Sequence, residues 1–291
     1  MNSIPMFLKN AKRDPTYIIT STPRSPPFHF FSFSFSFAAI KHQADVDAFF
    51  YSTHNLIMMS KVILILGAGP NVGASVAHAF ASKGYKVALA SRSQKESDNT
   101  PSQIHIPTDA SNPDAVVAAF SKTKSLLANP SVVVYNVGAL TENPPEDPLS
   151  LNLEESDFEK DLVINTTSAF VAGQQAVLAF KSLPSSSSKT FIYTGNNLNE
   201  TIIPGLMDLG AGKSATAHII RTAAAAYQDE GFKFYYADER TADGGPAWSN
   251  INGEAHGKLY VELAEVKEQG PWQQTFVKGV GYVKFPVDGA S

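Results

Sequence analysis

The chain has 291 residues, of which 43% are hydrophobic and 17% charged, which is ordinary for a soluble globular protein with one substantial core. Its net charge of -4 and pI near 6.0 provide no field that attracts nucleic acid or an anionic membrane, so neither is an expected partner. The absence of cysteine excludes disulfides, thiolate metal sites and cysteine nucleophiles, and no metal site is expected.

The first 58 residues differ from the rest. They contain an alternation of phenylalanine and serine at residues 28–37 for which no partner strand can be identified, so low complexity describes them better than a strand. An organelle-targeting peptide and a mis-assigned start codon both account for this extension, and Met58-Met59 directly before a predicted strand favours the second. We expect a non-globular segment 1–58 and one domain at 59–291, in a protein that is cytoplasmic, or mitochondrial if the extension is a targeting peptide.

From residue 61 onward, short β-branched runs alternate with longer helical patterns, as in a parallel sheet built from βα units. Two helices carry local signals: one ends before Gly84, and another begins at Asn112-Pro113 with a capping residue and a first-turn proline. Longer helices are predicted at about 154–181, 205–228 and 254–268, and strands at 62–66, 86–90, 104–106, 131–135, 190–194, 232–237 and 282–285. The expected fold is a single Rossmann-type, doubly wound α/β domain of about seven parallel strands with helices on both faces. No stretch has the roughly 18 apolar residues of a membrane span.

The first predicted strand ends in a glycine-rich turn that leads directly into a helix. Backbone N–H groups in such a turn can approach a pyrophosphate at the positive end of the helix, and Gly73 allows close packing of helix and sheet. A strand before and a helix after support a dinucleotide-binding turn, although a tight turn without a ligand is the alternative. The expected cofactor-binding residues of the turn are Gly67, Gly69, Asn71, Val72 and Gly73.

The second predicted strand ends in Ser91-Arg92-Ser93, and no carboxylate follows before Glu96. NAD-binding proteins usually place a carboxylate here for the ribose 2′-hydroxyl, whereas arginine suits the 2′-phosphate of NADP. Arg92 with Ser91 or Ser93 therefore predicts a phosphate clamp and NADP as cofactor, with NAD less favoured; a solvated surface arginine is the alternative.

These residues resemble the short-chain dehydrogenase/reductase family from about residue 61 to the C-terminus. The family's Gly-x-x-x-Gly-x-Gly pattern matches at Gly67 and Gly73, with Asn71 in place of the middle glycine. The resemblance implies further roles for Asp109 (at the adenine ring), Asn136 and Gly138 (in the family's Asn-Asn-Ala-Gly signature, here Tyr135-Asn136-Val137-Gly138) and Asn165 (shaping a proton-relay water).

The catalytic centre departs from the family's pattern. Members carry a serine after strand five and then Tyr-x-x-x-Lys, in which tyrosine is the general acid and lysine binds the nicotinamide ribose. Here Asn196 stands at the serine and Leu209 at the tyrosine, with Lys213 at the lysine. The resemblance implies catalytic roles for Asn165, Asn196 and Lys213, and an altered proton donor, since leucine has no proton to give. Three substitute acids stand nearby, although packing or solvation also explains each: Tyr135, Asp208 and His218.

The expected function is that of an NADP-dependent oxidoreductase acting on a small carbonyl or alcohol. The alternatives are an NADP-binding sensor or interaction protein without turnover, and a non-redox enzyme that uses the same pocket. A polar segment at residues 238–245, where the family has Pro-Gly, leads into the expected substrate lid. Trp248 and Trp272 either line an apolar substrate site or belong to the core, and a homo-oligomer is compatible with the sequence.

Overall fold

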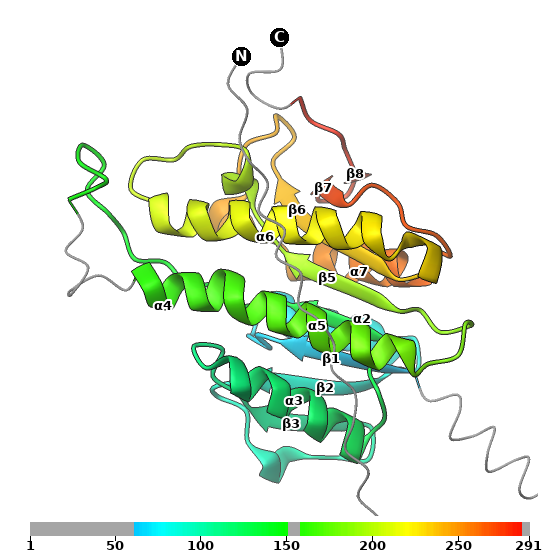
Figure 1. Ribbon diagram of the computed structural model, residues 1–291. Helices are drawn as coiled ribbons and strands as arrows, with labels where there is room; N and C mark the ends of the chain where they lie inside the picture. Colours follow the sequence, from blue (N-terminus) through cyan, green and yellow to red (C-terminus); the bar gives the residue numbers. More distant parts are fainter. Residues whose placement is uncertain (1–60, 151–157, 287–291) are drawn as a thin grey trace, which may run out of the picture. The chain divides into compact units, whose positions relative to one another are not determined.

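The computed structural model describes residues 61–150 and 158–286. The predictions for residues 1–58 lie outside the described residues. In the described part, eight strands form one sheet in the order β3-β2-β1-β4-β5-β6-β7-β8 (Figure 1). Strands β1 to β7 pair in parallel and β8 is antiparallel to β7, which confirms the expected doubly wound sheet.

The elements follow one another in the predicted alternation. The strands are β1 (Val62–Leu66), β2 (Lys86–Ser91), β3 (Gln103–Pro107), β4 (Val132–Tyr135), β5 (Thr190–Thr194), β6 (Lys233–Arg240), β7 (Gln273–Val277) and β8 (Gly281–Tyr282). The helices are α2 (Val72–Ser82), α3 (Pro113–Leu126), α4 (Phe158–Leu162), α5 (Ser168–Lys181), α6 (Met207–Ala226) and α7 (Gly253–Glu265), and a π-helical turn, Val163–Thr167, joins α4 to α5.

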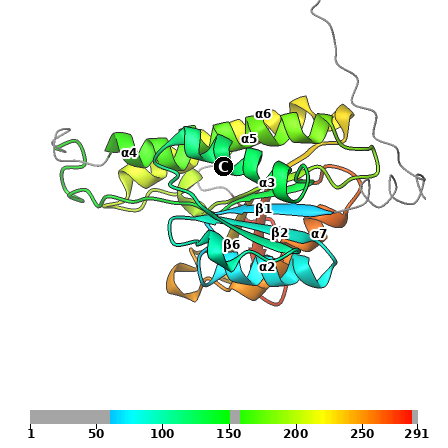
Figure 2. The ribbon, with the colours of Figure 1, turned by 90° about the horizontal axis from the view of Figure 1, so that it is seen from below.

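Helices cover both faces of the sheet. Helices α3, α5 and α6 lie on one face, and α2 and α7 lie on the other (Figure 2). Each face has its own apolar core: one includes Phe180 and Tyr193, the other Phe80 and Tyr260, and all four are fully buried. Because the chain moves outward from β1 to β3 and then returns to β4, a crevice opens at the carboxyl ends of β1 and β4, where such folds bind ligands.

Local signals explain the helix boundaries. Gly84 has a φ of 78°, the left-handed conformation expected after a helix. Asn112 caps α3 by accepting a hydrogen bond from Asp114 N at 3.0 Å. The run Phe158–Lys181 is long and apolar enough to cross a membrane by composition, with a mean hydropathy of 1.2. Its buried residues, including Ala172 and Ala176, pack on the sheet as in a core helix.

Two strand predictions were wrong. The last strand was expected at 282–285, but β7 lies at Gln273–Val277, and only Gly281–Tyr282 pairs with it, antiparallel. Because β7 begins with two glutamines, Gln273 and Gln274, its sequence lacks the hydrophobic pattern by which strands are predicted. Strand β6 also continues through Asp238-Glu239-Arg240, which were assigned to a polar loop, because these charges are buried and paired with other polar groups.

Candidate functional site

The glycine-rich turn fits tightly against the end of β4. Gly67 has a φ of 84°, and a Cβ atom added there would lie 2.5 Å from the carbonyl oxygen of Asn136. The Asn136 side chain in turn donates from Nδ2 to the Gly67 carbonyl at 2.9 Å. At Gly73, an added Cβ would lie 2.7 Å from Ala68 Cα. Glycine is therefore required at both positions, one for the approach of β4 and the other for the packing of α2.

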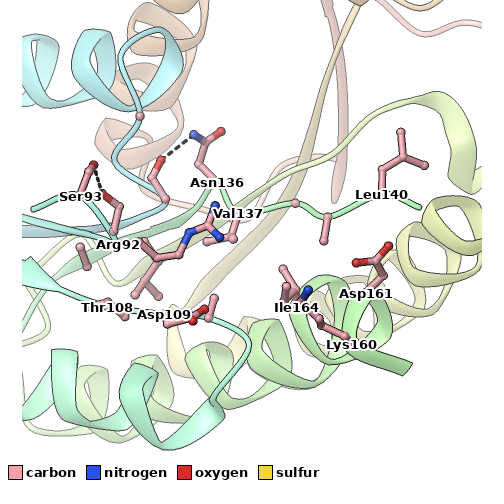
Figure 3. A pocket seen from close by; sticks show the side chains of 18 of the residues that line it. Arg92, Ser93, Thr108, Asp109, Asn136, Val137, Leu140, Lys160, Asp161 and Ile164 are labelled. Atoms are coloured by element: carbon pink, nitrogen blue, oxygen red, sulfur yellow. Dashed lines mark hydrogen bonds between the residues drawn. The ribbon is translucent and has the colours of Figure 1, made fainter. Parts of the chain in front are cut away.

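A cavity of about 550 Å³ opens beside this turn (Figure 3). It brings together seven of the predicted cofactor-binding residues: Gly67, Gly69, Ser91, Arg92, Asp109, Asn136 and Gly138. It also contains Ser93, the other serine considered for the phosphate clamp. Side chains that the sequence interpretation missed line it too, among them Thr108, Leu140, Thr141, Lys160, Asp161 and Ile164. Lys160 and Asp161 lie about one helical turn before Asn165, so helical spacing was the signal that could have found them.

The end of β2 supplies the cationic wall of the cavity. Figure 3 shows the Arg92 side chain extending into the cavity. Ser91 and Ser93 share a hydroxyl hydrogen bond of 3.3 Å. Gln94 Nε2 donates to Ser91 Oγ and to the Ala68 carbonyl, each at 3.2 Å, and so ties this loop to the glycine turn. On the facing loop, hydrogen bonds from Ser111 lower the pKa of Asp109, and Arg92 adds to the effect.

Asn71, Val72 and Gly73 do not line the cavity. Val72 and Gly73 are buried at the start of α2, and Asn71 is the N-cap residue but makes no side-chain bond to its own helix. Its Nδ2 donates instead to the Ile251 carbonyl at 2.9 Å, and its Oδ1 accepts from Gly253 N at 3.1 Å. Ala74 N in the first turn of α2 already donates to the Gly69 carbonyl at 2.9 Å, so the backbone donors left for an anion are those of Val72 and Gly73, which have no side-chain cap.

Asn165 holds the loop that follows β4. The residue is fully buried in the π-helical turn, and its side chain accepts from Ala139 N at 3.1 Å and donates to Ala139 O at 2.8 Å. Its own carbonyl accepts from Tyr193 Oη at 3.2 Å and Thr216 Oγ1 at 2.7 Å. In the described structure, Asn165 therefore fixes one wall of the cavity through side-chain and main-chain contacts.

Lys213 lies on α6, outside the lining of the cavity, and its side chain reaches the end of β5. It is 5% exposed, and its Nζ donates to the Thr194 carbonyl at 3.1 Å and lies 4.5 Å from the centre of the Tyr193 ring. Burial lowers the pKa of Lys213 to about 8, and the nearby Asp238 opposes part of this shift. At neutral pH the ammonium form predominates, but it can lose its proton far more readily than an exposed lysine.

Tyr236 fixes the turn that carries Asn196 through two hydrogen bonds. The Tyr236 hydroxyl donates to the Asn196 carbonyl at 2.7 Å and accepts from Asn196 N at 3.1 Å. A Cβ atom on Gly195 would lie 2.1 Å from the Tyr236 ring, so only glycine fits there. The Asn196 side chain accepts from Leu198 N at 3.1 Å. Tyr236 is a positioning residue that the sequence interpretation did not identify.

The three substitute acids are used in other ways. Tyr135 is fully buried and donates to the Ile164 carbonyl at 2.6 Å, and burial raises its pKa far above the usual value. Asp208 is 1% exposed, and its Oδ2 accepts from Thr141 N at 2.8 Å, which fixes the loop after β4. His218 is exposed on α6. None of the three lines the cavity.

A buried ionic network continues from Lys213 along β6. Arg240 donates through Nε to Asp238 Oδ2 and through Nη2 to Glu200 Oε2, the latter at 3.1 Å. Gln273 donates to the other Glu200 oxygen at 2.8 Å. Burial raises the pKa of Asp238 to about 6, although Arg240 opposes the shift. These residues link the strand to the loop after β5, and pairing across the sheet concealed them from sequence reasoning.

The cavity suits a nicotinamide dinucleotide. Its volume is within the range of small-molecule sites, and the glycine-rich turn on its wall leads into the start of α2, which has no side-chain cap. A Cβ atom on Gly69 would meet nothing within 4 Å, so the backbone of the turn is open to an approaching group. Arg92 and the serines beside it would hold a phosphate, and Asp109 lies where the adenosine end would bind.

Comparison with known proteins agrees with this geometry. The family model for short chain dehydrogenases matches residues 61–236. The protein named short chain dehydrogenase/reductase dmxR12, from Cryptosporiopsis sp. (strain 8999), is 48% identical over 242 residues, which cover 79% of this chain and 97% of that protein.

Solved structures share the fold. A short-chain dehydrogenase/reductase from Serratia marcescens has a TM-score of 0.59 and 20% identity, covering 75% of this chain and 96% of that one. BdcA, solved in complex with NADPH, has a TM-score of 0.57 and 18% identity, covering 79% and 98%. From the extent of the family match and the high identity to a full-length relative, the chain belongs to the short-chain dehydrogenase/reductase family.

Proposed function

We propose that this family member is an NADP(H)-dependent oxidoreductase that interconverts a small carbonyl compound and its alcohol. The observation that carries the proposal is the polar cavity at the crevice of the sheet. Arg92 extends into this cavity from the end of β2, where NAD-binding proteins usually have a carboxylate. When bound, the dinucleotide supplies or accepts a hydride. The NADPH complex of BdcA, which shares the fold, is consistent with this choice of cofactor.

We assign Lys213 as the general acid that donates the proton during carbonyl reduction. Reduction of a carbonyl creates an alkoxide that must be protonated, and an acid works best when its pKa lies near the working pH. Tyr135 donates its one hydroxyl proton to a backbone carbonyl, Asp208 accepts from the backbone and His218 is exposed. Lys213 Nζ donates one of its three N–H groups to the Thr194 carbonyl, which leaves two for a substrate oxygen, and its pKa is about 8. Lys213 Nζ gives its proton to the alkoxide oxygen and becomes a neutral amine; in the reverse direction the neutral amine accepts the proton of the alcohol.

Asn196 and Asn165 support this step. Tyr236 fixes the backbone at Asn196, which would orient the carbonyl oxygen through a hydrogen bond. Asn165 secures Ala139 and hence the wall between the dinucleotide and α6. Leu209, half-buried on α6 four residues before Lys213, adds apolar surface but no proton.

The proposal is tested by single-turnover oxidation of NADPH against a panel of carbonyl compounds and by NADP⁺ reduction against the matching alcohols. Carbonyl reduction is expected to slow as the pH rises through about 8, because Lys213 loses its proton there. Alcohol oxidation is expected to rise over the same interval. A protein that binds NADPH but turns over no member of the panel instead supports the sensor or non-redox alternatives.

A further inference from the structure

Asn71 stands where the family's pattern has a glycine, and its side chain does something that glycine could not do. It reaches from the nucleotide-binding turn to the start of α7 through two hydrogen bonds, to the Ile251 carbonyl at 2.9 Å and from Gly253 N at 3.1 Å. The backbone of Asn71 is set by the turn, since its carbonyl accepts from Ser75 N at 3.1 Å in the first turn of α2. Asn71 thus connects the nucleotide-binding turn to the start of α7.

The nucleotide-binding turn and the start of α7 are in close contact, and no side chain larger than glycine fits between them. A Cβ atom on Gly253 would lie 2.4 Å from Ser75 Oγ and 2.7 Å from Asn71 Oδ1. One turn further along α7, a Cβ atom on Gly257 would lie 3.0 Å from the Ser75 carbonyl oxygen. Helices α2 and α7 therefore pack closely from their first residues, and a displacement of the turn cannot be absorbed by empty space.

The segment that precedes α7 is the lid segment, residues 241–252, and it is held at both ends. At its start, Arg240 Nη1 donates to the Gly244 carbonyl at 3.0 Å. At its end, Asn252 N donates to Glu239 Oε2 at 2.7 Å, beside the two bonds of Asn71. Between these anchors, Trp248 is 55% exposed and has a φ of 49°.

That conformation is uncommon for a bulky residue, and surrounding anchors are needed to maintain it. The exposure of Trp248 also settles one of the alternatives raised by the sequence, because the residue is not part of the core. The lid segment leaves β6 directly after the residues that contact the loop of Asn196, so it starts next to the reaction site.

We propose that Asn71 couples the nucleotide-binding turn to the lid segment, so that binding of the dinucleotide sets the position of Trp248. The coupling rests on the proposed function, because NADP(H) is the ligand that fixes the turn. The coupling is reciprocal, so any ligand that holds the lid segment in its bound position would tighten the dinucleotide by the same factor. The glycine of the family's pattern cannot make this link, so the coupling is a property of the asparagine.

The test uses the full chain with Trp272→Phe, which leaves Trp248 as its one tryptophan. NADP⁺ is titrated by calorimetry, and in parallel the emission maximum and acrylamide quenching of Trp248 are followed. We expect binding to shift the emission and to reduce quenching. Asn71→Gly, studied at saturation with NADP⁺, should lose this response. Asn112→Gly, the same substitution at the N-cap of α3, should retain it.

The outcomes separate the two proposals. A saturated Asn71→Gly protein that responds like its parent overturns the coupling, as does a parent that binds NADP⁺ with no change at Trp248. If the parent does not bind NADP⁺ at all, the proposed function fails, and the coupling with it. Should Asn71→Gly not fold, Gly253→Ala disturbs the same contact from the other side, because its Cβ meets Asn71 and Ser75, and the same loss is expected.

Discussion

The carboxyl edge of the sheet has two halves that are built by different means. The nucleotide half, after β1, β2 and β4, uses glycine turns and short polar side chains around an open cavity. The reaction half, after β5 and β6, uses charged and aromatic side chains that are buried and joined, such as Lys213, Asp238 and Arg240. Asn196 and Leu209, where the sequence departs from the family's catalytic pattern, fall in the second half. Under the proposed function, the nucleotide site is retained while the chemistry beside it is altered.

The largest expected effect concerns Lys213. If it supplies the proton, Lys213→Met should slow single-turnover carbonyl reduction by about 10²–10⁴-fold, the usual contribution of a general acid. The matched control is Lys233→Met, which removes another buried lysine whose pKa burial lowers to about 8, but which binds the Ala264 and Val266 carbonyls. The control is expected to lose stability while the folded fraction keeps its rate. Equal rate losses in both variants would contradict the assignment.

The buried ionic network should dominate the stability of the reaction half. Arg240→Met leaves Asp238 and Glu200 without their cation, and breaking such a pair from one side costs about 3–5 kcal/mol. Urea unfolding followed by circular dichroism measures the loss. The exposed pair of Lys83 and Glu265, 3.6 Å apart, provides the comparison, and Lys83→Met should cost less than about 1 kcal/mol. Similar losses for both would show that the network is not energetically special.

Arg92 tests the nucleotide half. Arg92→Ala should weaken NADPH binding by about 1.5–3 kcal/mol, the worth of hydrogen bonds to a charged group, and should leave NADH binding nearly unchanged. Isothermal titration of both cofactors gives the comparison directly. Lys95→Ala, a nearby cation that does not line the cavity, serves as the control for general charge. A parallel loss of NADH affinity would argue against a 2′-phosphate contact.

The smallest expected effect is a gain of activity. Leu209→Tyr places a hydroxyl one helical turn before Lys213, and Asn196→Ser restores the serine of the family's pattern. The double variant should raise NADPH-dependent reduction of an activated ketone by at least about tenfold, a modest part of what an added general acid can contribute. Lys213→Met in that background should remove the gain. If neither the wild type nor a folded, NADPH-binding double variant reduced any ketone, the pocket would be unsuited to hydride transfer.

The contrast between the halves also explains what could be predicted from sequence. The sheet, the helices and seven residues of the cavity were predictable because glycine turns, caps and β-branched runs act over a few neighbouring positions. The network of Glu200, Asp238 and Arg240 was not, because Glu200 lies on a separate segment and the charges of Asp238 and Arg240 resemble a polar loop. The side-chain bonds of Asn71 to residues about 180 positions away were likewise invisible to local patterns.

The most direct test of the account is the affinity of the wild-type protein for NADPH and NADH, measured by calorimetry at one pH and salt concentration. NADPH is expected to bind at least about tenfold more tightly than NADH, because only NADPH carries a 2′-phosphate that can bind Arg92 and the neighbouring serines. Equal affinities, or tighter binding of NADH, would contradict the assignment of the nucleotide half.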